Sequence, residues 1–366
     1  MKWFQKLILG SSQVTKFRFR RIVLISLSWT AIDLFLYLRH VSGRDDIDYP
    51  YHEISFSACL LRSAIVLVIS FIMSWLLLKE IRIAFVKRSL LTSFIIKVFL
   101  LLLVAVTAGI TIFTLHFLII KKMSFGETIS ELQSYFLYTR LATDSLLFWM
   151  VMLISALVIV EIDQKYSPGV FWEVLTGKYL KPRNEKRIIM FLDLKDSTPI
   201  SEQLGHEKYF LFIKDFIYWV SKAILENEGM IYQYVGDEVV VTWPYRKLNI
   251  LKSMNAVIES RRSIQRNSDY FRREYNGIVP DFRVGLHAGD VTIGEIGIMK
   301  KDIAISGEAM NIAARIRSTC NELNQKFVVS KDYFESGILK SWQGEDLGEV
   351  SLKGLDESMQ LYALKI

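Results

Sequence analysis

Long apolar runs separated by short charged stretches fill the first part of the chain. A membrane-crossing helix needs about 20 apolar residues, and four runs reach or approach that length: 22–38, 60–78, 98–120 and 145–162. We therefore predict a four-helix transmembrane domain over 22–162, preceded by a basic tail over 1–21.

The charges beside these runs predict an orientation. The tail and the loop over 79–97 are rich in Lys and Arg, whereas the loop over 40–58 is acidic. Because short basic loops stay in the cytosol, we expect an integral protein of the plasma (inner) membrane, in contact with membrane lipid. Its N-terminus and the chain after the last run would be cytosolic. Asp33 lies within the first run, where we expect it to face a neighbouring helix.

The pattern changes after residue 162. Residues 163–186, with Pro168 and Gly169, predict a linker or signal transducer. From 187 to 366 the apolar positions follow strand and helix periods in the order strand–helix–strand–strand–helix–strand. That order is the ferredoxin-like arrangement of an α+β domain. The expected fold class is therefore a four-span membrane helical bundle followed by a ferredoxin-like domain.

Individual elements follow from the same periods. The expected strands are 187–194, two strands within 230–243 that turn at Gly236 and Asp237, a strand pair over 282–297, a short strand at 301–307, and three last strands over 326–330, 349–354 and 359–366. The expected helices are 199–227, 246–275 and 307–323.

Composition and charge support a membrane half rather than a nucleic-acid partner. The 366 residues are 51% hydrophobic and carry a formal net charge of +7. Many of the basic residues lie beside the apolar runs, whereas nucleic-acid binding predicts a basic patch on one soluble face. The two cysteines, Cys59 and Cys320, form no metal or disulfide pattern.

Two aspartates are candidate metal ligands. Asp193 ends a predicted strand, and Ser197 or Thr198 is expected to cap the next helix. A helix N-terminus binds anions, so a carboxylate there makes sense if a divalent ion bridges it to phosphate. Asp237 lies at the tip of the predicted hairpin, and two such carboxylates can hold two Mg²⁺ ions. Either aspartate alone would be ordinary.

A third candidate group lies on the helix over 307–323. Asn311 and Arg315 are four residues apart and share one helical face. An exposed Asn–Arg pair is often only solvated, but an arginine that faces a nucleotide can bind phosphate with its fork of donors.

Five motifs in order resemble the catalytic domain of class III adenylate and guanylate cyclases. The resemblance covers about 187–366 and rests on FLDLKDST (191–198), YVGDEVVVTW (234–243), GLHAGDVTIGEIG (285–297), SGEAMNIAARI (306–316) and LKGLDESMQLYAL (352–364). It implies a nucleotide cyclase that converts ATP to cAMP and pyrophosphate at the interface of a head-to-tail homodimer.

The resemblance also implies residue roles. Asp193 and Asp237 would hold two divalent ions, Mg²⁺ or Mn²⁺, and Asn311 would position the ribose of the nucleoside triphosphate. Arg315 would stabilise the charge at the α-phosphate. The expected phosphate-binding residues are Lys353, Ser197 and Thr198. The aspartates of one subunit would act with the Asn/Arg helix of the other, without a side-chain nucleophile, and His206 and His287 are expected to be surface or packing residues.

The predicted base-recognition positions depart from the family's pattern. Gln233 stands where adenylate cyclases usually have Lys, and Ala304 where they have Asp or Thr. Asp302 lies two residues away on the same strand face and is a candidate substitute. Asp196 stands where the family commonly has Gly. A guanylate or pyrimidine-nucleotide cyclase therefore stays an alternative, as do a catalytically silent nucleotide-binding receptor and, less favoured, a transporter with a regulatory domain.

Overall fold

The computed structural model describes most of the chain as two compact units that divide near Gln164 and Lys165. The described residues are 13–42, 56–84, 90–120, 122–138, a few positions between 150 and 158, 170–299, 301–335, 344–354 and 358–365.

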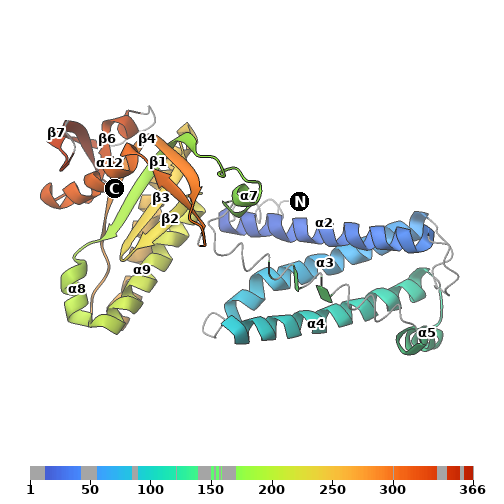
Figure 1. Ribbon diagram of the computed structural model, residues 1–366. Helices are drawn as coiled ribbons and strands as arrows, with labels where there is room; N and C mark the ends of the chain where they lie inside the picture. Colours follow the sequence, from blue (N-terminus) through green and yellow to red (C-terminus); the bar gives the residue numbers. More distant parts are fainter. Residues whose placement is uncertain are drawn as a thin grey trace. The chain divides into compact units, whose positions relative to one another are not determined.

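The described part of the first unit is helical (Figure 1). Its elements are α2 (Gln13–Ser42), α3 (Phe56–Ala84), α4 (Leu90–Leu115), the π-helical turn η1 (His116–Ile120) and α5 (Phe125–Tyr138). Side chains join α2 to α3: the Arg62 guanidinium donates to both carboxylate oxygens of Asp33, at 3.0 and 3.3 Å. The expectation that Asp33 faces a neighbouring helix is therefore confirmed.

The predicted four-span membrane bundle is wrong. Among the described helices, none combines the length with the apolar composition that crossing a membrane requires. Ionisable residues lie within the first two apolar runs, namely Asp33 in α2 and Arg62 in α3, and such a group costs about 3 kcal/mol at a bilayer centre. The fourth run, 145–162, lies almost entirely outside the described residues. The predicted location in the plasma membrane depended on these spans and is therefore also wrong. The expected contact with membrane lipid was inferred from the same spans.

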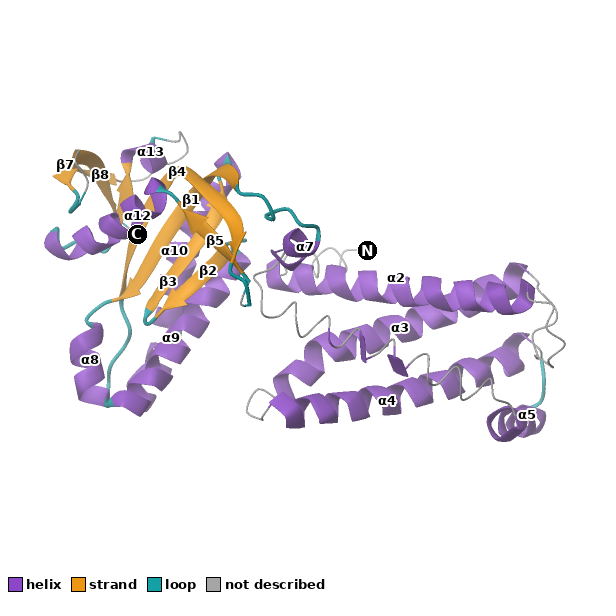
Figure 2. Ribbon diagram, viewed as in Figure 1, coloured by secondary structure: helices purple, strands orange, loops and turns teal. Residues whose placement is uncertain are grey.

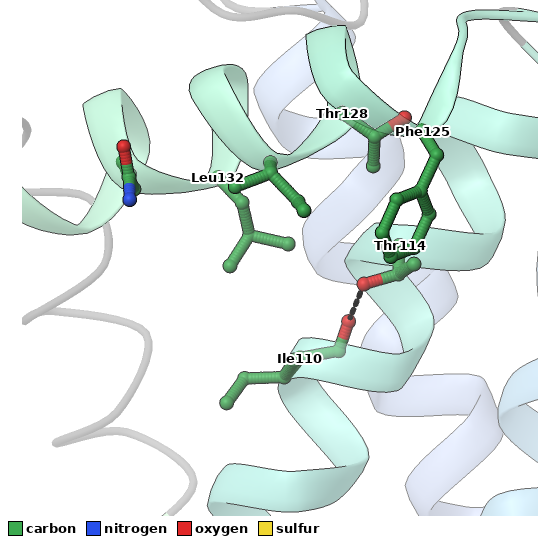
Figure 3. Close-up of a pocket in the computed structure, with 7 residues that line it drawn as sticks. Ile110, Thr114, Phe125, Thr128 and Leu132 are labelled. Carbon is green, nitrogen blue, oxygen red and sulfur yellow. Dashed lines mark hydrogen bonds between the residues drawn. The ribbon is translucent and has the colours of Figure 1, made fainter.

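Helices α4 and α5 line a small, open and mainly apolar cavity of about 180 Å³. Figure 3 shows Ile110 and Thr114 on one side and Phe125, Thr128 and Leu132 on the other. Thr114 Oγ1 donates to the Ile110 carbonyl at 2.8 Å, so its polar atom is satisfied within its own helix. The cavity offers few polar groups to a ligand.

The second unit is an α+β domain built on one sheet (Figure 2). Its helices are α7 (Val170–Leu175), α8 (Ser197–Leu204), α9 (His206–Glu226), α10 (Lys247–Arg266), α11 (Ser268–Glu274), α12 (Glu308–Glu322) and α13 (Lys331–Phe334). Its strands are β1 (Arg183–Leu194), β2 (Met230–Val235), β3 (Glu238–Pro244), β4 (Phe282–Ile296), β5 (Asp302–Ser306), β6 (Phe327–Ser330), β7 (Gly344–Ser351) and β8 (Ser358–Leu364).

The strand order matches the ferredoxin-like prediction. The sheet runs β2-β3-β1-β4-β6-β8-β7, with β5 paired to β4. Strand β1 pairs antiparallel with both β3 and β4, which places it at the centre of the β2-β3-β1-β4 core. The helices α8 and α9 follow β1, and α10 and α11 follow β3, so the element order is the one expected from the sequence.

Alternate residues of β1 face two different layers because side chains along a strand point to opposite faces. Ile188, Met190 and Leu192 pack in a core with side chains of α9 and α10. Ile189 and Phe191 pack on the other face with side chains of α12. The two helical layers therefore cover opposite faces of the sheet (Figure 2).

The segment 282–297 differs from its prediction. It is a single strand, β4, rather than a strand pair. Its glycines allow close packing instead of turns: a Cβ at Gly285 would lie 2.4 Å from the backbone nitrogen of Arg317 in α12. Two predicted helices are also each divided in two, at Gly205 and at Asn267.

Candidate active site

Asp193 lies one residue from the end of β1, on the face that α12 covers. It is directly opposite Glu238 of β3 and Arg283 of β4 in the two strand ladders. It follows Ile189 and Phe191 at alternate positions, so its side chain belongs to the same face as theirs. The central position of β1 therefore fixes where this carboxylate stands.

Asp237 lies in the two-residue turn between β2 and β3, beside Gly236, whose φ of +62° is in the left-handed region that suits glycine. Its Oδ2 atom is buried and has no hydrogen-bond partner among the described residues. A buried carboxylate oxygen without a partner is costly, so this atom fits a site that holds a cation.

The two aspartates are close enough to interact. Burial raises the pKa of Asp193 to about 6; the Arg317 guanidinium opposes that rise, and the charges of Asp237 and Glu238 add to it. The structure therefore brings the two predicted metal ligands into one electrostatic cluster at adjoining strand ends.

Arg317 is a member of this cluster that the sequence reasoning missed. Its Nη1 atom lies 3.2 Å from Asp193 Oδ2, and its Nη2 atom lies 2.5 Å from Glu238 Oε2. It stands two residues beyond Arg315, so the spacing on α12 could have flagged it as facing the sheet while Arg315 faces away.

The phosphate-loop residues lie where β1 leads into α8. Asp196 is the N-cap residue, in a left-handed conformation with φ of 58°, and its side chain makes no capping hydrogen bond. The predicted capping by Ser197 or Thr198 is therefore wrong by one position, because both are already helical.

Burial raises the pKa of the Tyr209 hydroxyl, and so do the charges of Asp237 and Asp193, whereas a hydrogen bond with Ser197 opposes the rise. Tyr209 thus borders the same cluster, which the sequence reasoning did not predict.

Asn311 and Arg315 form a second group on the exposed face of α12. A Cβ built at Gly354 would lie 3.7 Å from Arg315 Nη2, so this guanidinium approaches the turn after β7. Exposed Lys353 is the neighbour of Gly354 in that turn. Asn311, Arg315 and Lys353 are thus all exposed to solvent. Arg317 lies on the inner side of α12 and contacts Asp193 instead.

The predicted base-recognition residues lie on β2 and β5. Gln233 is exposed on β2, and Ala304 of β5 pairs with Gly294 of β4. The Ile305 N–H donates to the Tyr232 hydroxyl at 3.2 Å, which links the two strands. The Asp302 carboxylate accepts from the N–H of Ile303 at 2.9 Å, so one of its oxygens is engaged locally.

The two histidines agree with the expectation of surface and packing roles. His206 is exposed at the start of α9. His287 is buried within β4, where its Nδ1 lies 2.8 Å from Ser330 Oγ, and burial lowers its pKa to about 4. At neutral pH it is therefore uncharged.

The carboxylates suit a divalent ion that shares its coordination with a ligand. Among the described residues, no three His, Cys, Asp or Glu side chains form a cluster able to hold a metal. Mg²⁺ is usually bound by one or two carboxylates together with substrate phosphates. Asp193 and the unpartnered oxygen of Asp237 fit that mode of binding.

Comparisons with known proteins identify the family of this chain. Adenylate cyclase 2 of Rhizobium meliloti (strain 1021) is 30% identical over 208 residues, which are 56% of this chain and 57% of that protein. An adenylate cyclase of Anabaena cylindrica is 24% identical over 214 residues, 55% of this chain and 42% of that protein. The chain thus spans about half the length of the curated relatives it matches.

A solved structure of a bacterial light-regulated adenylyl cyclase has the same fold, with a TM-score of 0.52 and 16% identity over 62% of this chain and 66% of that one. The family model of the adenylate and guanylate cyclase catalytic domain matches residues 180–366, about half of the chain. The protein therefore belongs to the adenylate and guanylate cyclase catalytic domain family.

Proposed function

We propose that the chain is a nucleotide cyclase that converts ATP into cAMP and pyrophosphate. The observation that carries the proposal is that the carboxylates of Asp193 and Asp237 lie close enough to interact electrostatically. The buried Oδ2 atom of Asp237 also has no hydrogen-bond partner among the described residues. The family and the two adenylate cyclases among its relatives support the same reaction.

Asp193 and Asp237 would hold two divalent ions, Mg²⁺ or Mn²⁺, together with the triphosphate of the substrate. Such ions neutralise phosphate charge and favour attack by a hydroxyl oxygen. The two carboxylates come from the end of β1 and the β2–β3 turn, so the rigid sheet fixes their separation.

The remaining residues would bind and orient the nucleotide. Arg315 would stabilise the charge that grows at the α-phosphate, as a guanidinium fork does well. Asn311 would position the ribose so that its 3′ oxygen attacks the α-phosphorus while the bond to pyrophosphate breaks. Lys353, Ser197 and Thr198 would bind the phosphates, the last two at the N-terminus of α8.

The site would be completed by a second copy of the chain. Asn311 and Arg315 are exposed on the outer face of α12, while Arg317 of the same helix pairs with Asp193 of its own subunit. This division supports a head-to-tail homodimer in which each site takes its aspartates from one subunit and its Asn/Arg helix from the other.

In this proposal the parts of the chain have separate roles. Residues 187–366 belong to the cyclase domain, whose first strand β1 already begins at Arg183, and the preceding residues from 163 form a linker or transducer that contains α7. Tyr179 anchors that linker, because it is buried against the α12 face of the sheet and its carbonyl accepts from the Glu295 N–H at 2.9 Å.

The residues predicted to recognise the nucleotide base also support an alternative to ATP as the substrate. Gln233 carries both a donor and an acceptor, and Ala304 cannot hydrogen-bond a base through its side chain. A guanylate or pyrimidine-nucleotide cyclase, or a silent nucleotide-binding receptor, is therefore the competing proposal.

The purified full chain, supplied with Mn²⁺ or Mg²⁺ and each of ATP, GTP, CTP and UTP, tests these proposals. We expect cAMP from ATP, and a loss of turnover of at least about 100-fold in Asp193→Asn and Asp237→Asn. Asp269→Asn, a change at an exposed carboxylate of α11, is the matched control and should keep full turnover.

The outcomes separate the alternatives. A different cyclic nucleotide as the main product would replace adenylate cyclase by the corresponding activity. Nucleotide binding without any cyclic product would instead favour the silent receptor.

A further inference from the structure

Three carboxylates interact electrostatically at the candidate metal site, although their side chains do not converge as a three-ligand cluster. Asp193 and Asp237 are the proposed ligands, and Glu238 follows Asp237 directly in the chain. Glu238 is also the partner of Asp193 in the β1–β3 ladder, where two like charges directly opposite each other destabilise a sheet. The side chains of Asp193 and Glu238 are only 21% and 13% exposed, so water screens their repulsion poorly.

Arg317 resolves this conflict by joining the two opposed carboxylates. One arm of its guanidinium lies 3.2 Å from Asp193, and the other lies 2.5 Å from Glu238. The guanidinium thus donates a hydrogen bond to one oxygen of Asp193, and it forms an ion pair with Glu238 whose geometry is not that of a hydrogen bond.

The backbone that carries Arg317 is itself held in place. Helix α12 packs on β4 and β1, and Gly285 of β4 allows the backbone nitrogen of Arg317 to come so close that a Cβ there would clash at 2.4 Å. The close approach of the helix therefore fixes the point from which the Arg317 side chain reaches Asp193 and Glu238.

An unrestrained Glu238 would be a third metal ligand. Additional carboxylates raise the affinity of a site for a divalent ion. A catalytic ion, however, must keep positions open for the substrate phosphates, since Mg²⁺ in such sites is held by only one or two carboxylates. Extra protein ligation would therefore strengthen ion binding while it weakened catalysis.

We infer that Arg317 is a positioning residue that holds Glu238 away from the divalent ions, so that their open coordination positions stay available to the triphosphate. This inference rests on the proposed function, because it requires an ion at Asp193 and Asp237. It assigns Arg317 a role distinct from that of Arg315: it acts within its own subunit, through Glu238 and Asp193.

Binding of Mn²⁺ alone to the full chain, followed by electron paramagnetic resonance, tests the inference without nucleotide. We expect Arg317→Gln to bind Mn²⁺ roughly tenfold more tightly than the parent, because the released Glu238 would add one charged ligand to the site. The double variant Arg317→Gln/Glu238→Gln should return to about the parent affinity. In turnover with ATP, Arg317→Gln should lower kcat even at saturating Mn²⁺.

Arg283→Gln is the matched control. Arg283 also lies opposite Asp193 in the sheet, and its charge lowers the pKa of that carboxyl, but its loss does not release Glu238. A tightening in Arg283→Gln equal to that in Arg317→Gln, or a double variant as tight as Arg317→Gln, would overturn the inference.

Circular dichroism shows whether Arg317→Gln folds, and Glu238→Gln supplies a second measurement if it does not. Arg317 would then pair with Asp193 alone and compete with the ion, so Mn²⁺ should bind several-fold more weakly than in the parent; an unchanged affinity overturns the inference. If the parent binds no Mn²⁺, or Asp193→Asn binds it equally well, the proposed metal site is wrong and the inference falls with it. Normal parent binding without tightening in folded Arg317→Gln overturns the inference alone.

Discussion

Single residues in this protein acquire their properties from their layer in the sheet. Asp193 and Phe191 are two residues apart on β1 and face the same side, yet one ends in a charged cluster and the other in the core. His287 shows the same effect inside β4, because burial beside Ser330 keeps its ring neutral. Burial is therefore the largest cause of the pKa shifts of Asp193 and His287.

Acid should destabilise the second unit through His287. Its pKa is about 4 when folded and 6.5 as a free side chain, so only the unfolded chain takes up the proton between those values. The stabilisation is present above pH 6.5 and is lost as the pH falls to 4. It amounts to about 3 kcal/mol at most, at 1.36 kcal/mol per pKa unit.

The measurement is urea denaturation of the parent and of His287→Gln at several pH values from 7 to 4. Gln keeps a hydrogen bond to Ser330 within reach but does not titrate. Other groups, Asp193 among them, cancel in the difference between the two chains. The prediction is contradicted if the difference in unfolding free energy stays constant over this range.

At the scale of elements, the contact between α12 and β4 determines the shape of the site. Helix α12 carries Asn311 and Arg315 outward and Arg317 inward, so its distance from the sheet decides whether Arg317 reaches β1. Gly285 sets that distance, since its missing side chain admits the helix backbone.

Gly285→Ala should force α12 away from the sheet. The added Cβ would lie 2.4 Å from Arg317 N and 2.7 Å from the Ala313 carbonyl oxygen, and overpacking of this kind costs roughly 1–3 kcal/mol. A lower thermal unfolding temperature and reduced cyclase activity are expected.

Gly294→Ala on the same strand is the comparison for that change. Its Cβ would meet Pro182 at 3.4 Å, an ordinary contact, so the loss of stability should be clearly smaller. Equal losses in the two variants would show that the approach of α12 is not what Gly285 provides.

At the scale of the whole molecule, the proposed dimer predicts complementation between two inactive chains. Asp193→Asn lacks a metal ligand but keeps Arg315, and Arg315→Ala has the reverse defect. In a mixed dimer of the two, one of the two sites combines an intact aspartate pair with an intact Arg315, so it should be active.

An equal mixture of the two variants, unfolded and refolded together or co-expressed, should recover about a quarter of the parent activity, because half of the dimers are mixed and each has one intact site. Each variant alone is the control and should stay inactive. Recovery of no activity in proven mixed dimers would place both groups of residues in a single subunit's site.

Much of the second unit could be predicted from the sequence alone. The β1 run and the β2–β3 hairpin are local patterns: apolar residues with strand spacing around Gly236 and Asp237 specify them whatever the surroundings. The five motifs likewise indicated the family that residues 180–366 match.

Other features depended on the tertiary structure. The single strand β4 replaced a predicted pair, because whether Gly285 marks a turn or a close approach depends on α12, which lies elsewhere in the sequence. The four-span bundle was predicted from apolar length, yet no described helix meets the requirement for a span. Arg317 was missed because its partners Asp193 and Glu238 are distant in the chain, and only the folded sheet brings them within reach of its side chain.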